Sequence, residues 1–300
     1  MYPLFSLRYF CSLFGRSRQS YYEHTNRVEK ADMAEALVLK LVKEIREQLP
    51  RAGVPKLMVM LRNKFTEHGI KMGRDALYRL LGQHGYLIRY RRRRVYTTDS
   101  NHPYRKYPNL IRELYYLTAA GQLWVSDITY LRIQSRFAYL SIVTDAYSHK
   151  IIGYCLYPTL ASTGPINALQ MASRSRRTAS LIHHSDRGVQ YCCKDYVDVL
   201  EHLKINISMT ENGDPYENAV AERVNGILKE EFLLNKTFAS FQQAEQAVKS
   251  AVERYNHIRP HASCDNLTPV AAHECSGMLP KRWKSRNRKK IQSSEQPLVV

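Results

Sequence analysis

Three acidic residues stand in surroundings where a carboxylate must be paired, coordinated or used in chemistry. Asp127 lies inside the apolar run WVSDITY, where a charge is costly without a partner or a metal ion. Asp186 directly follows a predicted strand, and open α/β sheets place their sites at the carboxyl ends of strands. Glu222 lies in a predicted helix between alanines that allow close approach to a sheet. Each also has a structural interpretation: a buried ion-pair partner, a turn cap and an exposed helix residue.

Together, such carboxylates suit a hard divalent cation. Mg²⁺ takes oxygen ligands and keeps several waters, so a few convergent carboxylates suffice to bind it. Two ions about 4 Å apart activate the attacking oxygen and stabilise the leaving oxygen in phosphoryl transfer. The three residues therefore predict a site for one or two Mg²⁺ or Mn²⁺ ions.

The elements that would position these residues belong to a mixed α/β sheet. Leu123–Ile133, Phe137–Asp145 and Ile151–Tyr157 are β-rich runs separated by turn-sized gaps, which predicts a meander. The elements expected after it are the helix Ile166–Arg174, the strand Ser180–His184, the helix Gln190–Leu203, the strand Lys204–Met209, and the helices Asn218–Phe232 and Ser240–Asn256. This order predicts a sheet with helices on its faces.

The chain before residue 89 has helical periodicity. An apolar face ends at Gly15, and Ser17 is a plausible N-cap for a second helix, so the first segment predicts a small helix-turn-helix. We expect a longer helical unit to begin at Asp32, where Glu35 completes a capping-box pattern.

The last helix of that unit is predicted at about residues 74–81, after a helix that begins near Pro55 and ends at Gly69. Arg74 and Arg79 would face a major groove if this is a helix-turn-helix or winged DNA-binding unit. A helical bundle with a solvated basic face remains an equal alternative.

The positive charge is concentrated at the two ends of the chain. Residues 1–120 carry 23 Lys and Arg against 10 Asp and Glu, residues 121–240 carry 12 of each, and residues 241–300 carry 10 against 5. A neutral centre between basic flanks suggests a polyanionic partner. We expect an extended linker on DNA phosphates where four consecutive arginines occur: Arg91, Arg92, Arg93 and Arg94.

The spacing of the carboxylates carries a family resemblance. Thirty-five residues lie between Asp186 and Glu222, as in the D,D(35)E signature. The chain resembles the retroviral-integrase-like transposases, especially OrfB of the insertion-sequence-three family. The resemblance covers roughly residues 5–273, and the matching segments read WVSDITYL, HHSDRGVQY, NGDPYENAVAERVNGILKEEF and YNHIRPHASCDNLTPVAAH.

The resemblance implies a ribonuclease H-like catalytic core preceded by all-α helix-turn-helix DNA-binding modules. It implies that Asp127, Asp186 and Glu222 are the metal-binding catalytic residues. Lys229 matches the family's basic residue that contacts the transposon end, and Asn218, on the same helix face, is expected to touch DNA or the metal's surroundings.

Four other polar residues lie near these motifs and have the chemistry of site residues. His183 and His184 precede Asp186, and strand packing is as good an explanation for them as a role near the site. Asp145 and Asp214 lie in predicted turns, where Asp is common for local hydrogen bonding, so we expect both to lie outside the site.

The implied activity is metal-dependent cleavage at transposon ends followed by strand transfer of the freed 3′-hydroxyl. The alternatives are a catalytically silent DNA-binding regulator derived from such an element and a ribonuclease H-like hydrolase. The implied partners are double-stranded DNA and further copies of the chain on that DNA. The family often makes a longer product by frameshifting from an upstream reading frame that carries a leucine zipper. This chain has no sustained heptads, so a protein from that upstream frame is a further expected partner.

Composition and length complete the prediction. No apolar stretch approaches the length of a membrane span, and the six cysteines show neither metal-ligand spacing nor a disulfide framework. We therefore expect a cytoplasmic protein, and the resemblance implies a bacterial one associated with the nucleoid. The predicted domains are a small helix-turn-helix at 1–28, a DNA-binding domain at 29–88, a basic linker at 89–119, the catalytic core at 120–275 and a basic tail at 276–300.

Overall fold

The chain forms two compact units, residues 1–92 and residues 93–300, in the computed structural model. The structure describes residues 6–88, 102–112, 116–178, 180–211 and 218–282. The arginine run at residues 91–94 and Asp214 lie outside these ranges. Among the described helices, none has the length and hydropathy needed to cross a membrane.

The first unit begins with a short helix and a very long one. α1 spans Leu7–Leu13 and α2 spans Arg18–Gln48. The expected N-cap is confirmed, since the Ser17 hydroxyl accepts a hydrogen bond from the Ser20 amide at 3.0 Å. The expected helix start at Asp32 is wrong. No Gly or Pro interrupts the chain between the cap and Gln48, so nothing ends the helix before Asp32.

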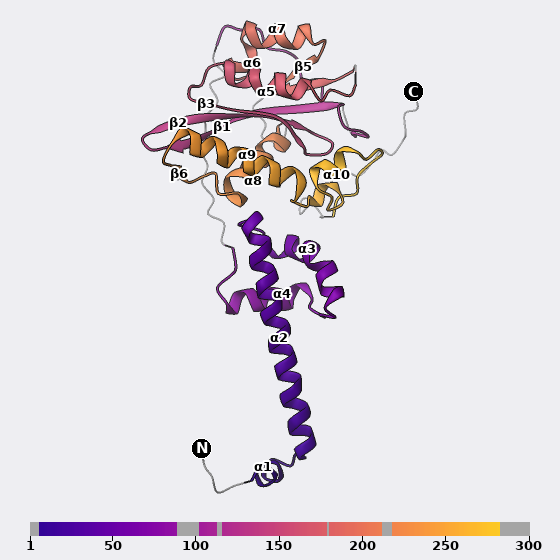
Figure 1. The fold of residues 1–300 in the computed structure, drawn as a ribbon. Coiled ribbons are helices and arrows are strands. Elements are labelled where there is room, and N and C mark those ends of the chain that lie inside the picture. The colour runs from indigo at the N-terminus through magenta and orange to yellow at the C-terminus, as the bar shows by residue number, and fades with distance from the viewer. Residues whose placement is uncertain (1–5, 89–101, 113–115, 179, 212–217, 283–300) are drawn as a thin grey trace. The chain divides into compact units, whose positions relative to one another are not determined.

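The remaining helices of this unit pack against the second half of α2. α3 spans Val54–Glu67 and α4 spans Arg74–Gln83, close to their predicted bounds. Their apolar faces bury Leu57, Leu61, Leu77, Leu80 and Leu81 beside Val38 and Val42 of α2. The predicted helical character of this region is confirmed, and the boundary predicted between residues 28 and 29 falls inside α2 (Figure 1).

The second unit is built on a six-stranded mixed sheet. Its strands are β1 (Leu123–Ile133), β2 (Arg136–Asp145), β3 (Ile151–Tyr157), β4 (Ile182–Ser185), β5 (Asn206–Met209) and β6 (Thr237–Phe238). The order is β3-β2-β1-β4-β5; the first three are antiparallel neighbours, and β4 and β5 run parallel to β1. β6 pairs with the far end of β1 and was not predicted. The expected mixed α/β sheet is confirmed.

Helices cover both faces of the sheet (Figure 1). α5 (Thr163–Ser173), α6 (Val189–Cys192) and α7 (Lys194–His202) cover one face, and α8 (Ala219–Glu231), α9 (Phe241–His257) and α10 (Pro269–His273) cover the other. The helix predicted at Gln190–Leu203 is divided, because Cys193 has extended backbone and begins α7 as its N-cap.

Alternation along β1 decides which side chains meet which helices. Trp124 packs with the buried residues of α5 and α7, whereas Leu123 and Val125 pack with Ala221 of α8. Successive strand side chains point to opposite faces, so Asp127 continues the row that faces α8. On the other face, α5 comes so close to β3 that a Cβ on Gly153 would lie 2.0 Å from the Ala168 carbonyl oxygen.

Candidate functional site

Strand register brings Asp127 and Asp186 together. β1 and β4 are paired in parallel, with Val125 opposite His184. This register, continued past the end of β4, directs Asp186 toward Asp127, and the charge of Asp186 raises the pKa of Asp127. β4 ends at Ser185, so Asp186 lies directly after the carboxyl end of a strand that runs parallel to β1. Open α/β sheets commonly place their sites there.

Glu222 comes from α8, and its charge also acts on Asp127. It lies in the first turn of this helix, and its side chain is exposed. Asn218, at the N-cap of α8, donates from its amide nitrogen to the Ser126 carbonyl oxygen at 3.0 Å. This buried contact fixes the start of α8 against β1, one residue from Asp127.

A second asparagine binds Asp127 itself. Asn225 lies three residues after Glu222 and is buried, and its side-chain nitrogen donates to Asp127 Oδ2 at 2.7 Å. The other carboxylate oxygen accepts from the Ile128 amide at 2.9 Å. Both oxygens of Asp127 therefore have fixed donors, which orient the carboxylate.

The electrostatics couple the three acids to one another. Burial raises the pKa of Asp127 to about 7, with further contributions from the charges of Asp186 and then Glu222, while the hydrogen bond from Asn225 opposes the rise. Burial and the charge of Asp186 raise the pKa of Glu222 as well. Like charges held close together produce this pattern, and a bound cation would relieve it.

Oxygen atoms without hydrogen bonds lie beside these carboxylates. Within the described part of the chain, the buried side-chain oxygens of Asn218 and Asn225 have no hydrogen-bond partner. Amide and carboxylate oxygens are the ligands that hard divalent cations take, so the chemistry of this donor set fits such an ion. No three His, Cys, Asp or Glu side chains among the described residues are already grouped to hold a metal. Convergence of all three carboxylates to metal-binding distance stays a prediction.

The pH dependence of stability is expected to report this crowding. A carboxyl whose folded pKa is raised contributes stability that is present below about pH 4 and is lost as pH rises through about 7. In chelator, we expect Asp127→Asn to melt higher than the unmodified chain at pH 8, by roughly 4–8 °C for a difference of about 2 kcal/mol. The gap should shrink towards pH 5. Melting curves between pH 5 and 9 measure it, and a gap independent of pH would contradict the coupling.

Lys229 lies on the same face of α8 as Asn218, Glu222 and Asn225. Its ammonium nitrogen lies 4.1 Å from the centre of the Tyr130 ring. Burial lowers its pKa, and the nearby charge of Asp127 works in the opposite direction. Lys229 therefore places a cation next to the carboxylates.

The two histidines before Asp186 hydrogen-bond within the interior of the unit. His183 Nε2 lies 2.7 Å from the Ser126 hydroxyl and 2.9 Å from the Tyr196 hydroxyl, and burial lowers the pKa of His183 to about 3. His184 Nδ1 lies 2.8 Å from the Ser208 hydroxyl. Both histidines are fully buried, so these contacts tie β4 to its neighbours.

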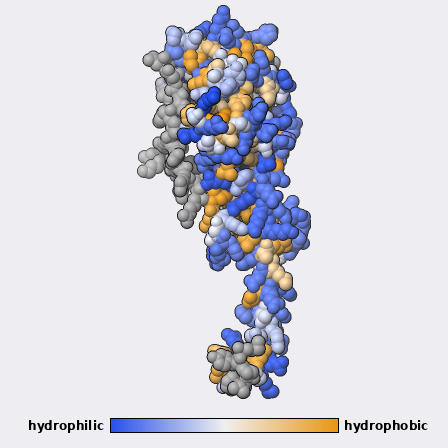
Figure 2. All heavy atoms as spheres, turned by 60° about the vertical axis from the view of Figure 1, so that its left-hand side comes forward, coloured by the Kyte–Doolittle hydropathy of each residue, from blue (hydrophilic) through white to orange (hydrophobic). Residues whose placement is uncertain are grey.

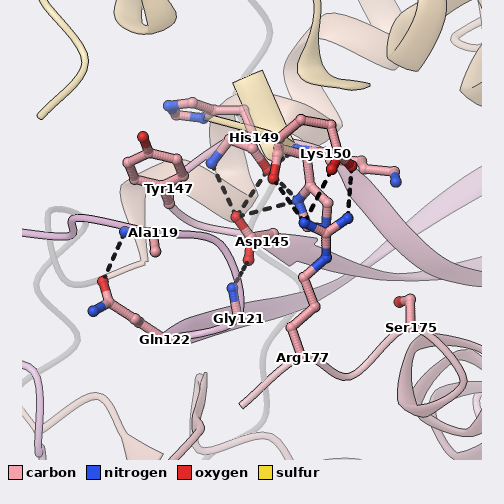
Figure 3. Close-up of polar contacts among 12 residues, drawn as sticks. Ala119, Gly121, Gln122, Asp145, Tyr147, His149, Lys150, Ser175 and Arg177 are labelled. Atoms are coloured by element: carbon pink, nitrogen blue, oxygen red, sulfur yellow. Dashed lines mark hydrogen bonds and ion pairs between the residues drawn. The ribbon is translucent and has the colours of Figure 1, made fainter. Parts of the chain in front are cut away.

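Asp145 organises a different corner of the sheet (Figure 3). Its carboxylate is fully buried and accepts from the Gly121 amide at 2.7 Å and from the Ser148 amide and hydroxyl at 2.9 and 2.8 Å. The Ser148 hydroxyl also lies 2.9 Å from His273 Nδ1, at the end of α10. Asp145 thus joins the end of β2 to the chain after α9.

The end of α9 and the segment after it hold the sheet and α8 in place. Asn256 pairs with both backbone polar groups of Ile151, at 3.0 and 2.9 Å, as a neighbouring strand would. Arg259 forms a buried two-pronged ion pair with Glu231 at the end of α8, at 2.8 and 2.9 Å. The motif YNHIRPH therefore fixes the C-terminal end of the helix that carries Glu222.

The predicted DNA contacts of the first unit occupy exposed positions. Arg74 and Arg79 lie on the exposed face of α4, and Arg74 pairs with the equally exposed Asp75 at 3.0 Å. The surface of both units is mainly hydrophilic in the view of Figure 2, with scattered hydrophobic side chains.

Sequence patterns did not identify Asn225 as a site residue. The available signal was its spacing, since residues 218, 222, 225 and 229 recur at helical intervals and share one face of α8. An asparagine on a helix is ordinarily solvated, and only the contact with Asp127 distinguishes this one.

Comparison with known proteins places this geometry in a family. Two models described as an integrase core domain match residues 118–215 and 203–269. The insertion element IS600 31 kDa protein of Shigella sonnei is 35% identical over 266 residues, which cover 88% of this chain and 97% of that protein. The putative transposase of IS986/IS6110 from Mycobacterium tuberculosis is 28% identical over 263 residues, or 84% of this chain and 92% of that protein.

Among solved structures, two from viral integration systems are similar to part of this chain. The HTLV-2 integrase catalytic core domain in complex with magnesium matches with a TM-score of 0.42 and 17% identity, over 52% of this chain and 98% of that one. A chain of the simian T-cell lymphotropic virus intasome in complex with PP2A regulatory subunit B56 gamma matches with a TM-score of 0.43 and 21% identity, over 60% of this chain and 64% of that one.

Proposed function

The chain belongs to the OrfB-type transposases of the insertion-sequence-three family, which have an integrase core, and we propose that Asp127, Asp186 and Glu222 carry out its DNA cleavage and joining. The observation that supports this site most strongly is the parallel β1–β4 pairing, which directs Asp186 toward Asp127. The charges of Asp186 and Glu222 that raise the pKa of Asp127, and the charge of Asp186 that raises the pKa of Glu222, add to it.

The proposed reaction has two phosphoryl-transfer steps. Water attacks a phosphodiester at the transposon end and frees a 3′-hydroxyl, which then attacks a second phosphodiester and displaces its 3′-oxygen. Asp127, Asp186 and Glu222 would hold one or two Mg²⁺ or Mn²⁺ ions, which supply Lewis-acid stabilisation of the attacking and leaving oxygens. Asn225 orients the carboxylate of Asp127, and Lys229 offers a cation to a phosphate near the reacting one.

The two units are proposed to share the DNA between them. Helices of residues 29–88, with residues 1–28 before them, would form the DNA-binding part, and residues 89–119 the basic linker. Residues 120–275 would form the catalytic core and 276–300 a basic tail. Several copies of the chain would assemble on the ends and the target DNA, within the bacterial nucleoid.

The rival functions fit the chain less well. A silent regulator has no need of all three carboxylates, yet Asp127, Asp186 and Glu222 are all present. A hybrid-cleaving hydrolase has no need of a positively charged helical unit ahead of the core, yet residues 1–120 carry a net charge of +13 (23 basic minus 10 acidic).

A direct assay tests the proposed function. Purified chain is incubated with labelled duplexes that carry the ends of its own element, with Mg²⁺ or Mn²⁺ or with chelator. We expect a new 3′ end at the element boundary and joined products, both dependent on metal. A binding protein that leaves every phosphodiester intact would be the regulator instead.

The arginine run and α4 should differ in what they contribute to DNA binding. Replacing Arg91, Arg92, Arg93 and Arg94 by Ala removes up to four phosphate contacts, so the slope of log affinity against log salt should fall by about 3 to 4. Preference for cognate ends should hardly change. Replacing Arg79 should instead cost about 1–3 kcal/mol of that preference if its guanidinium bonds a guanine.

Titrations against cognate and scrambled ends at three salt concentrations separate these effects. Lys71→Ala, an exposed change in the same unit, serves as the matched control for Arg79. An unchanged slope for the arginine-run variant would mean that the run is solvated. An unchanged preference for Arg79→Ala would make α4 part of a helical bundle that reads no bases.

A further inference from the structure

Two aromatic rings lie between two cations in a row that begins near the carboxylates. The Lys229 ammonium lies 4.1 Å from the centre of the Tyr130 ring. The rings of Tyr130 and Phe137 meet edge to face with their centres 5.2 Å apart. The Arg132 guanidinium lies 5.5 Å from the centre of the Phe137 ring. These four residues, the Lys229–Arg132 row, come from α8, β1 and β2.

The row begins at the proposed site and leads away from it. Tyr130 lies three residues after Asp127 on β1, so alternation places its side chain on the opposite face of the sheet from Asp127. Its link to the site is the contact with Lys229, on the helix that carries Glu222. β4 pairs only with residues 123–125 of β1 and β6 only with residues 132–133. Within the described part of the chain, the edge of β1 between them has no strand partner. At 3.3 Å per residue, Arg132 lies about 16 Å along the strand from Asp127.

Stabilisation of the hairpin does not account for the whole row. An aromatic cross-strand pair contributes to a sheet by packing its rings, and the half-buried Tyr130 serves that purpose. Phe137, however, keeps 42% of its surface exposed near the hairpin turn, and Arg132 is exposed beside it. A large apolar ring that stays in water between two cations has the composition of a nucleotide-binding surface.

We propose that the Lys229–Arg132 row binds an unpaired stretch of the DNA strand that leaves the cleavage site, with a base stacked on Phe137 and its phosphates beside Lys229 and Arg132. The proposal rests on the function given above. An intact duplex needs only cations for its phosphates, whereas an aromatic ring gains from a base only when that base is unstacked. Counted at the 3.4 Å per nucleotide of a duplex strand, the distance of about 16 Å to Arg132 corresponds to about five nucleotides from the reacting phosphate.

The test compares two DNA probes of the same sequence, with calcium in place of magnesium so that binding is measured without chemistry. One is a duplex of an element end, and the other has five unpaired nucleotides beside the cleavage position. We expect the unmodified chain to prefer the unpaired probe, and Phe137→Leu to reduce that preference about tenfold. Phe137→Trp should retain it, because a larger ring stacks at least as well.

Two further variants make the result specific. Arg132→Gln should weaken binding of the unpaired probe and lower its salt dependence, since it removes one phosphate contact. Tyr116→Leu removes a ring that is 74% exposed and lies outside the row, so it should change neither probe's binding. Melting temperatures confirm that each variant is folded.

The outcomes separate this inference from the function on which it rests. If Phe137→Leu and the unmodified chain show the same preference between the two probes, and cleavage in magnesium is intact, the row's role is overturned and the function stands. A chain that prefers the unpaired probe through Phe137 but never cleaves would support the row and contradict the cleavage mechanism.

Discussion

Asp127→Asn is expected to abolish cleavage and joining, by roughly a thousandfold or more, and to leave binding of DNA ends nearly unchanged. The substitution keeps the size of the side chain, and its remaining oxygen can still accept from Asn225 at the 2.7 Å contact. It removes the negative charge that would hold a metal ion over the reacting phosphate. It removes no phosphate contact, since a carboxylate repels phosphate.

Matched controls make the loss interpretable. Asp198→Asn makes the same chemical change at an exposed position of α7, on the face of the sheet away from α8, and should cleave normally. Gel-shift affinity and the cleavage rate are measured on the same preparations. Cleavage by Asp127→Asn at a rate near that of the unmodified chain would contradict the proposed mechanism.

The same site illustrates what a sequence can and cannot predict. Asp127 and Asp186 were identifiable because each breaks a local rule: one is a charge inside an apolar strand, and the other follows a strand directly. Both strands were predicted close to their true bounds. Glu222 breaks no such rule, since it is exposed on a helix, and only its spacing from Asp186 distinguished it.

Residues that act through tertiary contacts were harder to find. Asn225 and Asn256 are both asparagines within helices, and nothing in their neighbourhoods distinguishes them from solvated ones. One orients Asp127, and the other pairs with the backbone of Ile151, about a hundred residues earlier in the chain. Local patterns carry no information on such contacts, because the partner is chosen by the fold.

The prediction of the helix start at Asp32 failed for a different reason. Asp32 and Glu35 have the spacing of a capping box, but a cap forms only where the preceding chain has left the helix. The preceding residues from Arg18 onward contain no helix breaker, and Ser17 had already capped the helix. The absence of a stop signal should have outweighed the start signal.

The buried pair of Arg259 and Glu231 is expected to dominate the stability of the core. Arg259→Met should destabilise the second unit by about 3–5 kcal/mol, because it removes the Arg259 counter-charge from the buried Glu231 carboxylate. For a unit of this size, the melting temperature should fall by roughly 6–20 °C. The pair is only 4% and 11% exposed, so salt should screen it little.

A double variant shows whether the loss comes from the unpaired charge. Arg259→Met combined with Glu231→Met replaces the ion pair by apolar groups of similar volume, and such replacements are often neutral or stabilising. We expect the double variant to recover most of the lost stability, whereas two independent contributions would add. Glu274→Gln breaks the exposed pair with Arg177 and should leave the melting temperature nearly unchanged.

Activity in the double variant then distinguishes stability from positioning. Glu231 ends the helix whose first turn carries Glu222, so the directional ion pair with Arg259 fixes the helix along its axis, which two methionines cannot do. The recovered double variant should therefore bind DNA ends normally and still cleave them more slowly than the unmodified chain. Full recovery of cleavage together with stability would mean that Asn218 and Asn225 alone hold α8 at the site, and that the clamp after α9 serves only to stabilise the fold.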